Sequence, residues 1–196
     1  MSAEAKLKEL GIELPEPLAP AGNYVGATTV GNLVYLSGEG PRLPDGVISG
    51  KVGGDLTVED GQEAARLVGL NMLTTLRNHI GSLDRVKQIV KVFGMVNAVP
   101  EFKHHPAVIN GFSDLMVEVF GEKGRSARSA VGMSSLPFQI ACEVEMIVEI
   151  EYRWGTLPVM PRRISSPPRT AEPIRPRWST WRSAAWSTGW ASQSAP

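Results

Sequence analysis

Arg128 is the residue of this sequence whose type and neighbours point most directly to chemistry. It lies in "ARSAVGMSSLP" (127–137), a segment that otherwise holds small, apolar and hydroxyl-bearing residues. In a strand, side chains alternate between faces, so Arg128 would share a face with Ala130 and Gly132. Such small neighbours would leave a hollow beside the guanidinium, whose planar fork matches a carboxylate with two parallel hydrogen bonds. The alternative is a strand-edge arginine that lies in solvent or pairs with a surface acid.

Glu143 is the second candidate, and it lies in the alternating segment "QIACEVEMIVEIE". Apolar residues occupy every second position of this segment: Ile140, Cys142, Val144, Met146, Val148 and Ile150. Alternation predicts a strand with its apolar face on a core and its acids, Glu143 among them, on the other face. On the neighbouring strand we expect Val131 and Met133 to face that core. This places Arg128 and Glu143 together on the uncovered face, as a base and an acid near one another.

Two helices that would cover the other face are predicted from apolar spacing. The first begins near Thr57, which with Asp60 resembles a capping box, and it ends near Gly81. The second follows "HHP", with Pro106 in its first turn, and it ends at Gly121. Each carries an apolar stripe at helical spacing. The stripes are Ala65, Val68, Met72 and Leu76 in the first helix, and Val108, Phe112, Leu115 and Val119 in the second.

Strand-like runs precede and separate these helices. Runs over 23–30 and 32–40 meet at Gly31-Asn32, a dipeptide suited to a hairpin turn. A further turn is predicted at Asp45-Gly46, with a short strand over 47–49, and a long strand over 85–99. The order predicts an α+β fold: one mixed sheet with two helices on one face. The bare face then meets either solvent or another subunit.

Composition divides the chain into unlike parts. Residues 1–150 carry 13 Lys+Arg against 18 Asp+Glu, whereas 151–196 carry 7 against 2 and hold all five tryptophans. We therefore predict a lead-in over 1–20, a folded domain over 21–152 and a tail over 153–196. The tail is rich in Arg, Pro and Ser without apolar periodicity, which favours disorder, and it is read as out-of-frame or readthrough translation. The alternative is an arm that binds nucleic acid or a membrane surface.

The compartment is predicted from what the sequence lacks. A single cysteine, Cys142, cannot form an internal disulfide, which favours a reducing compartment. Neither an N-terminal apolar segment nor a run of 18 apolar residues is present, so secretion and membrane spanning are not expected. We expect a cytoplasmic protein with no membrane partner, in which Cys142 is a buried core residue.

The segment "ARSAVGMSSLPFQIACEVE" resembles the signature of the reactive intermediate (imine) deaminase family, the RidA or YjgF family. Three further features agree with it: Tyr24 before the first hairpin, Ser37-Gly38 at the end of its second strand, and Asn110 in the second helix. The resemblance covers about residues 18–151. It implies a chorismate-mutase-like fold and a homotrimer with active sites between subunits. It also implies hydrolysis of 2-imino or 2-enamino acids to 2-keto acids and ammonium, without a metal or organic cofactor.

The resemblance also assigns roles to individual residues. Arg128 would bind the substrate carboxylate, and Glu143 would position or activate the attacking water. Tyr24, Ser37, Gly38, Asn110 and Ala130 would line the substrate pocket, with the tyrosine reaching across from a neighbouring subunit. Because an imine carbon is already electrophilic, orientation plus one general acid–base group should suffice.

The sequence also departs from the family pattern. Ala130 stands where many members carry cysteine, which excludes thiol chemistry at that position. Glu39 stands where glutamine is common, which adds a negative charge near a site for anions. These changes leave the identity of the substrate open.

Other residues invite simpler interpretations. His104 and His105 are adjacent and have no ligand-spaced partner, so helix entry or solvent contact is favoured over metal binding. The segment "GKVGGDLT" lacks the spacing of a phosphate-binding loop, so a plain connection is expected.

Two other classes of function stay open. Some relatives are described as endoribonucleases, but a ribonuclease predicts a basic groove with aromatic platforms, whereas residues 1–150 are acidic and lack tryptophan. Nucleic acid is therefore not the expected partner. A non-catalytic binder of small carboxylates would use the same arginine, and only hydrolysis should need Glu143.

Overall fold

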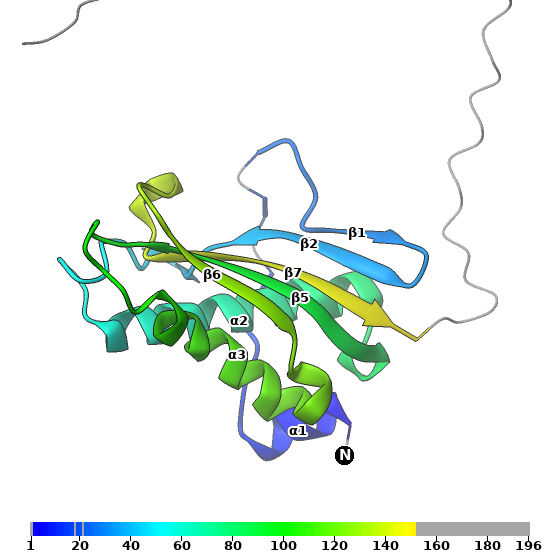
Figure 1. The fold of residues 1–196 in the computed structure, drawn as a ribbon. Coiled ribbons are helices and arrows are strands. Elements are labelled where there is room, and N and C mark those ends of the chain that lie inside the picture. The colour runs from blue at the N-terminus through cyan, green and yellow to red at the C-terminus, as the bar shows by residue number, and fades with distance from the viewer. Residues whose placement is uncertain (1, 18, 21, 152–196) are drawn as a thin grey trace, which may run out of the picture. The chain divides into compact units, whose positions relative to one another are not determined.

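The computed structural model describes residues 2–17, 19–20 and 22–151, and in it a single main sheet carries helices on one of its faces (Figure 1). The predicted tail over 153–196 lies outside these residues. The helices are α1 (Ala3–Glu9), α2 (Val58–Ile80) and α3 (His105–Phe120). The strands are β1 (Ala27–Val30), β2 (Leu33–Glu39), β3 (Arg42–Leu43), β4 (Gly46–Val47), β5 (Val86–Asn97), β6 (Ala127–Met133) and β7 (Cys142–Ile150).

The main sheet has the strand order β1-β2-β7-β5-β6 and mixes both kinds of pairing. The pairs β1–β2, β2–β7 and β5–β7 are antiparallel, whereas β5 and β6 are parallel. Parallel neighbours need a long crossover, and α3 provides it between β5 and β6. The predicted α+β class, mixed sheet and first hairpin are confirmed.

Both predicted helices begin and end where their capping residues indicate. Thr57 and Asp60 form a reciprocal capping box at α2, and Gly81 ends that helix in the left-handed conformation, with φ 85°. Pro106 lies in the first turn of α3, and Gly121 follows its last residue. The apolar stripes of both helices are buried in the main core, which lies between the helices and the sheet.

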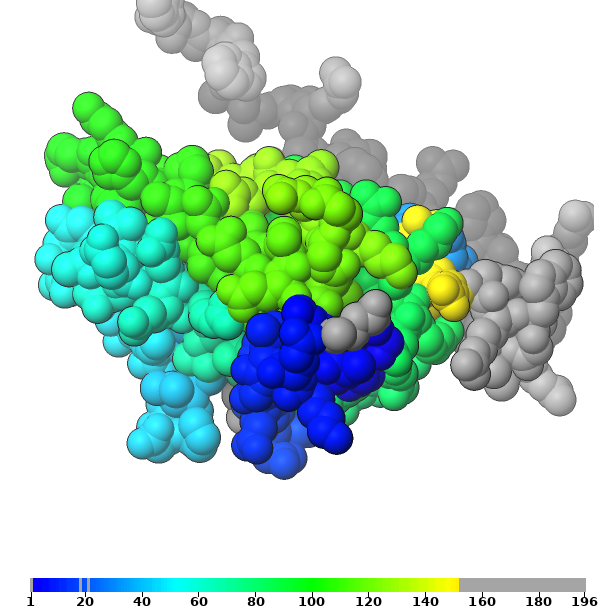
Figure 2. All heavy atoms as spheres, turned by 90° about the horizontal axis from the view of Figure 1, so that it is seen from below, coloured from blue at the N-terminus to red at the C-terminus, as the bar shows by residue number. Residues whose placement is uncertain are grey.

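The first residues of the chain contribute to this core. In α1, Ala3 and Leu7 are buried in the main cluster, and the Glu4 carboxylate accepts a 2.9 Å hydrogen bond from the backbone N–H of Leu83. Figure 2, which looks onto the helix side, shows α1 in blue beside the green surface of α3. The stretch predicted as a surface lead-in thus closes one end of the core.

The connection between β2 and α2 differs from its prediction in detail. The turn is centred on Pro44-Asp45 and not on Asp45-Gly46, and β3 and β4 form a separate two-stranded sheet around it. Beyond β4, Ser49 makes an isolated bridge to Ile140. The glycine-rich segment after it is the plain connection expected, because its glycine N–H groups already have partners in the protein. Gly53 donates to the carbonyl of Leu56 at 2.8 Å within the loop, and Gly50 donates to the carbonyl of Gln139 at 2.9 Å outside it.

The predicted facing of β6 is wrong. Residues paired across neighbouring strands lie on the same face of a sheet, and Met95 of β5 pairs with both Val131 and Glu143. Val131 is 37% exposed and lies with Glu143 on the face away from the helices. Arg128 pairs instead with the buried Val92, so its side chain lies on the helix side. Arg128 and Glu143 therefore leave opposite faces of the sheet.

The reason for this reversal is the close approach of α3 to the sheet. A Cβ on Gly94 would lie 2.6 Å from the side chain of Ile109, and a Cβ on Gly132 would overlap the ring of His105. The small residues on this side of the sheet thus make room for the helix and leave no hollow. The apolar Met133 packs on the opposite face, in a second cluster with Met95 and Ile140.

Gly94→Ala is expected to destabilise the fold by roughly 1–3 kcal/mol, the usual effect of overpacking. Three side-chain carbons of Ile109 would lie within 2.8 Å of the new methyl group, so α3 or β5 must shift. Urea denaturation of the pure protein measures the change. Gly46→Ala is the matched control, because nothing lies within 4 Å of its added Cβ. Equal midpoints for the two variants would contradict the close packing of α3.

Candidate functional site

A cavity of about 300 Å³ lies beside Glu143. Its walls come from the segment before β1, the end of β2, the β3–β4 turn, the loop before β7 and β7 itself. The lining residues are Gly22, Tyr24, Gly38, Glu39, Gly40, Arg42, Val47, Pro137, Phe138, Ile140 and Glu143. The structure thus brings together three of the predicted site residues, Tyr24, Gly38 and Glu143.

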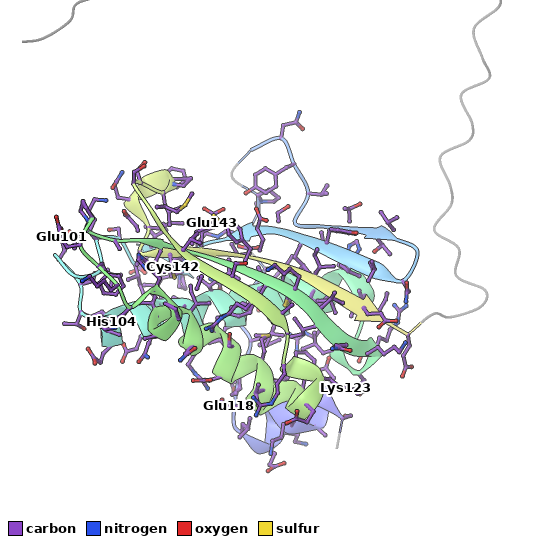
Figure 3. All side chains as sticks on the ribbon, viewed as in Figure 1. Glu101, His104, Glu118, Lys123, Cys142 and Glu143 are labelled. Atoms are coloured by element: carbon purple, nitrogen blue, oxygen red, sulfur yellow. The ribbon has the colours of Figure 1, made fainter. Side chains whose placement is uncertain are left out.

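Glu143 is half-buried in this cavity and projects from the face away from the helices, whereas its neighbour Cys142 points toward the core (Figure 3). Burial raises the pKa of the Glu143 carboxyl, and the negative charges of Glu145 and Glu39 raise it further. The side chain lies against Gly38, where a Cβ would overlap the carboxylate. Glycine is therefore needed at position 38 for Glu143 to lie where it does.

Glu39, the departure from the family pattern, does not leave a free negative charge at the site. It is 7% exposed, and its carboxylate pairs with the Arg42 guanidinium at 3.0 Å and accepts a 3.0 Å hydrogen bond from the Thr75 hydroxyl. The amide of Asn71 donates to the carbonyls of Gly40 and Arg42, which fixes the turn that carries this pair. The charge of Glu39 is thus largely balanced by Arg42.

Ser37 supports the cavity without lining it. Its hydroxyl donates a 2.7 Å hydrogen bond to the carbonyl of Val25, and its backbone N–H donates to the carbonyl of Gly26 at 3.0 Å. Both bonds hold the segment that carries Tyr24 against β2. The structure therefore gives Ser37 a positioning role at the cavity, whereas the family resemblance predicts a lining residue.

Arg128 lies outside this cavity, against α3. Its Nη1 donates 2.9 Å hydrogen bonds to Asn110 Oδ1 and to Ser113 Oγ, and its Nη2 donates a 3.4 Å bond to the carbonyl of Pro106. Asn110 thus orients the arginine, while Ala130 packs partly buried against the core. Neither the solvent-exposed nor the acid-paired arginine of the simpler interpretation is observed.

Arg128 keeps capacity for an external anion. A guanidinium has five N–H donors, and the bonds described above use three. Over the described part of the chain, no carboxylate forms an ion pair with Arg128. A cation whose nearest polar partners are neutral oxygens is suited to binding a carboxylate from elsewhere.

The predicted site is therefore divided into two parts. Tyr24, Gly38 and Glu143 lie around the cavity on one side of the sheet, whereas Arg128 and Asn110 lie together on the other. The expectation that Arg128 and Glu143 are neighbours within one chain is wrong, because the register of β6 places them on opposite faces. Glu143 groups with Tyr24, the residue expected to act from a neighbouring subunit.

Several residues of the two parts of the site were not predicted from the sequence, among them Ser113, Arg42 and Phe138. Ser113 follows Asn110 by three positions, and this spacing, which is visible in the sequence, places both residues on one face of α3. Arg42 and Phe138 carried no local signal, because they reach the cavity only through the packing of the two loops that border it.

The remaining polar candidates are structural. Burial raises the pKa of the Cys142 thiol to about 12, so the residue is the inert core cysteine expected. His104 and His105 lie at the start of α3 with edge-to-face contacts to Phe102. Among residues 2–17, 19–20 and 22–151, no three His, Cys, Asp or Glu side chains gather as metal ligands, and no helix is long and apolar enough to cross a membrane.

Gly38→Ala is expected to lower the pKa of Glu143 toward its ordinary value while leaving the fold intact. The added methyl group displaces the carboxylate, the flexible end of its side chain, from its half-buried position toward solvent. A ¹³C NMR titration of the glutamate carboxyl groups measures the shift. Gly46→Ala again serves as the control, and an unchanged Glu143 titration in Gly38→Ala would contradict the close contact.

Comparison with known proteins identifies the family. Residues 4–150 match the family model described as "YjgF/chorismate_mutase-like, putative endoribonuclease". The chain is 45% identical to Protein TCP17 of Trypanosoma cruzi over 148 residues, which covers 74% of this chain and 92% of that protein. It is 28% identical over 135 residues to "Putative regulator AldR" of Lactococcus lactis, with 68% and 93% covered.

Solved structures agree with this assignment. Atu1372 of Agrobacterium tumefaciens, a protein of unknown function, superimposes with a TM-score of 0.70 at 42% identity, with 77% of this chain and 93% of that one covered. A "putative endoribonuclease" of Shewanella oneidensis gives 0.74 at 36% identity, with 76% and 100% covered. The expected chorismate-mutase-like fold is confirmed, and the chain belongs to the RidA/YjgF family.

Proposed function

We propose that this protein hydrolyses reactive 2-imino and 2-enamino acids to 2-keto acids and ammonium, at sites shared between the subunits of a homotrimer. The observation that carries the proposal is the division of the site. One side of the sheet offers a guanidinium with spare donors that no carboxylate of the described residues pairs with, and the other offers a half-buried carboxylate in a cavity. Neither part is complete for this reaction by itself.

The proposed reaction needs one anion-binding group and one group that moves protons. Arg128, fixed by Asn110 and Ser113, binds the substrate carboxylate with its free N–H groups. Glu143 removes a proton from a water molecule as the water oxygen bonds to the carbon of the protonated imine, which gives a neutral carbinolamine. The protonated Glu143 then donates this proton to the amino nitrogen. The C–N bond breaks as the carbinolamine hydroxyl returns a proton to Glu143 and the carbonyl forms, and the released ammonia takes that proton and leaves as ammonium.

The environment of Glu143 supports this double role. A general acid–base group works best when its pKa lies near the working pH, and burial together with two neighbouring acids moves Glu143 upward from 4.5 in that direction. The Glu143 carboxylate lines a cavity whose walls exclude part of the solvent. Such a group can both accept and return a proton within one turnover.

The uncovered sheet face supports assembly. Tyr35 and Val131 are exposed large apolar residues there, and Phe93 and Ile147 are only partly buried, beside Lys91 and the glutamates of β7. This mixture of apolar and charged residues is typical of a face that meets another protein surface. In a cyclic trimer, an edge of one subunit contacts a different surface of the next, so Arg128 of one subunit can complete the Glu143 cavity of another.

The test is a coupled assay in which threonine dehydratase acts on threonine and releases a 2-imino acid. The rate of 2-oxobutanoate formation with this protein is compared with the uncatalysed hydrolysis. Acceleration by the wild type supports the proposal. Absence of acceleration across the imines of several amino acids would overturn it.

A non-catalytic carboxylate-binding trimer is the second candidate, because Arg128, held by Asn110 and Ser113, offers spare N–H donors to an anion without help from Glu143. It predicts binding of 2-keto acids that Glu143→Gln leaves intact and no acceleration of hydrolysis. The endoribonuclease named among the relatives is less favoured, since residues 1–150 carry a net negative charge.

A further inference from the structure

We propose that Phe138 makes this site selective for imino acids with sizeable apolar side chains, a specificity that rests on the proposed function. Phe138 lies on the rim of the Glu143 cavity and is 76% exposed. A phenyl ring held in water is unfavourable, and an apolar ligand group packed against it removes that cost.

The backbone at this position is held in a conformation that such residues avoid. Phe138 has φ 55° and ψ 16°, and Gln139 has φ 55°, both in the left-handed region that favours glycine. Strain of this kind persists where the surrounding structure imposes it and is concentrated at ligand-binding positions.

The surroundings do impose it. The carbonyl of Gln139 accepts a 2.9 Å hydrogen bond from the backbone N–H of Gly50 and a 3.4 Å bond from the Asn97 amide. Asn97 is fully buried, and its Oδ1 accepts a 2.8 Å bond from Lys51 Nζ, which also reaches the carbonyl of Ser134 at 2.9 Å. The loop is thus tied down on both sides of Phe138, so its ring is presented in a fixed place.

The cavity wall around the ring is apolar. Val47, Pro137 and Ile140 line it together with Phe138, while Glu143 provides the reacting carboxylate. A volume of about 300 Å³ is at the lower end for small-molecule sites, which suits an amino-acid-sized ligand. A methyl side chain would leave most of this wall in water, whereas an isobutyl or benzyl group would cover it.

The test compares wild type with Phe138→Asn. Asparagine tolerates the left-handed conformation, so the variant removes the ring while keeping the backbone. Titration calorimetry measures the binding of 4-methyl-2-oxopentanoate and of pyruvate, and the assay above measures kcat/KM for the matching imines. The control is Val30→Asn, which replaces another exposed apolar residue that lies at the hairpin turn, outside the cavity lining.

Wild type is expected to prefer the larger ligand, and Phe138→Asn should reduce the ratio of the two affinities and of the two kcat/KM values about tenfold or more. Val30→Asn should leave both ratios unchanged. Because binding is measured separately, an absence of imine hydrolysis in the wild type, together with a ratio of affinities that falls in Phe138→Asn, would overturn the deaminase and keep the role of Phe138.

Two outcomes would overturn the specificity proposal. One is an unchanged preference in Phe138→Asn. The other is a fall in the assembly's mass by light scattering in Phe138→Asn alone, which would show that the ring packs on another subunit.

Discussion

An equal mixture of Arg128→Ala and Glu143→Gln subunits, unfolded and refolded together, is expected to regain about a quarter of wild-type activity, although neither variant is active alone. Arg128→Ala removes the only proposed contact to the substrate carboxylate, and truncating one partner of such a charge pair costs about 2–5 kcal/mol. A site that takes its arginine from one subunit and its glutamate from the next is intact when a Glu143→Gln subunit supplies the arginine and an Arg128→Ala subunit supplies the glutamate. With random assembly this holds for about one interface in four.

The double variant, with both substitutions in one chain, is the control for this experiment. A double-variant subunit brings neither Arg128 nor Glu143 to an interface. When it is mixed with wild type, activity therefore falls with the fraction of interfaces that keep both groups. If the mixture of single variants stays inactive while assembling normally, the site lies within one chain. The placement of Arg128 and Glu143 on opposite faces of the sheet would then not require a second subunit for catalysis.

Glu143→Gln is expected to lower kcat by about 10²–10⁴, the usual contribution of general acid–base catalysis, while affinity for 2-keto acids is retained. The acid limb of the wild-type kcat/KM profile should lie above the ordinary glutamate value of 4.5, because the pKa of Glu143 is raised and the base must be ionised. The variant should lose this limb. Rate profiles between pH 4 and 8 measure both effects.

The same variant should not lose stability at neutral pH. A carboxyl whose pKa is raised in the folded state binds its proton more tightly there, so folding is favoured as pH falls through the folded pKa. Above that pKa the ionised Glu143 opposes folding, and the neutral glutamine does not. We therefore expect an equal or higher Tm for Glu143→Gln, with a catalytic loss that unfolding does not explain.

Glu145→Gln is the matched control, since Glu145 is exposed on the same face and its charge raises the pKa of Glu143. It should shift the acid limb to lower pH and keep kcat. A large fall in kcat for Glu145→Gln, with none for Glu143→Gln, would contradict the proposed base.

Local patterns along the chain predict the secondary-structure elements and the family. The capping box at Thr57, the end of α2 at Gly81 and the alternation over β7 are local patterns, because each arises from neighbouring residues along the chain. The segment from Ala127 to Glu145, with Tyr24, Ser37-Gly38 and Asn110, indicated the family, which the match over residues 4–150 confirms. These features need no knowledge of which strands are neighbours.

Which site residues meet depends on how the strands and helices pack, and local patterns do not reveal it. Ala130 and Gly132 leave space beside the strand, and their small size does not reveal whether a ligand or a helix fills it. A Cβ on Gly132 would overlap the ring of His105, so α3 fills this space. The register of β6 on β5 then places Arg128 with α3 and leaves Glu143 on the other face. Register depends on long-range pairing, and a change of one residue exchanges the two faces of a strand, so alternation alone could not decide it.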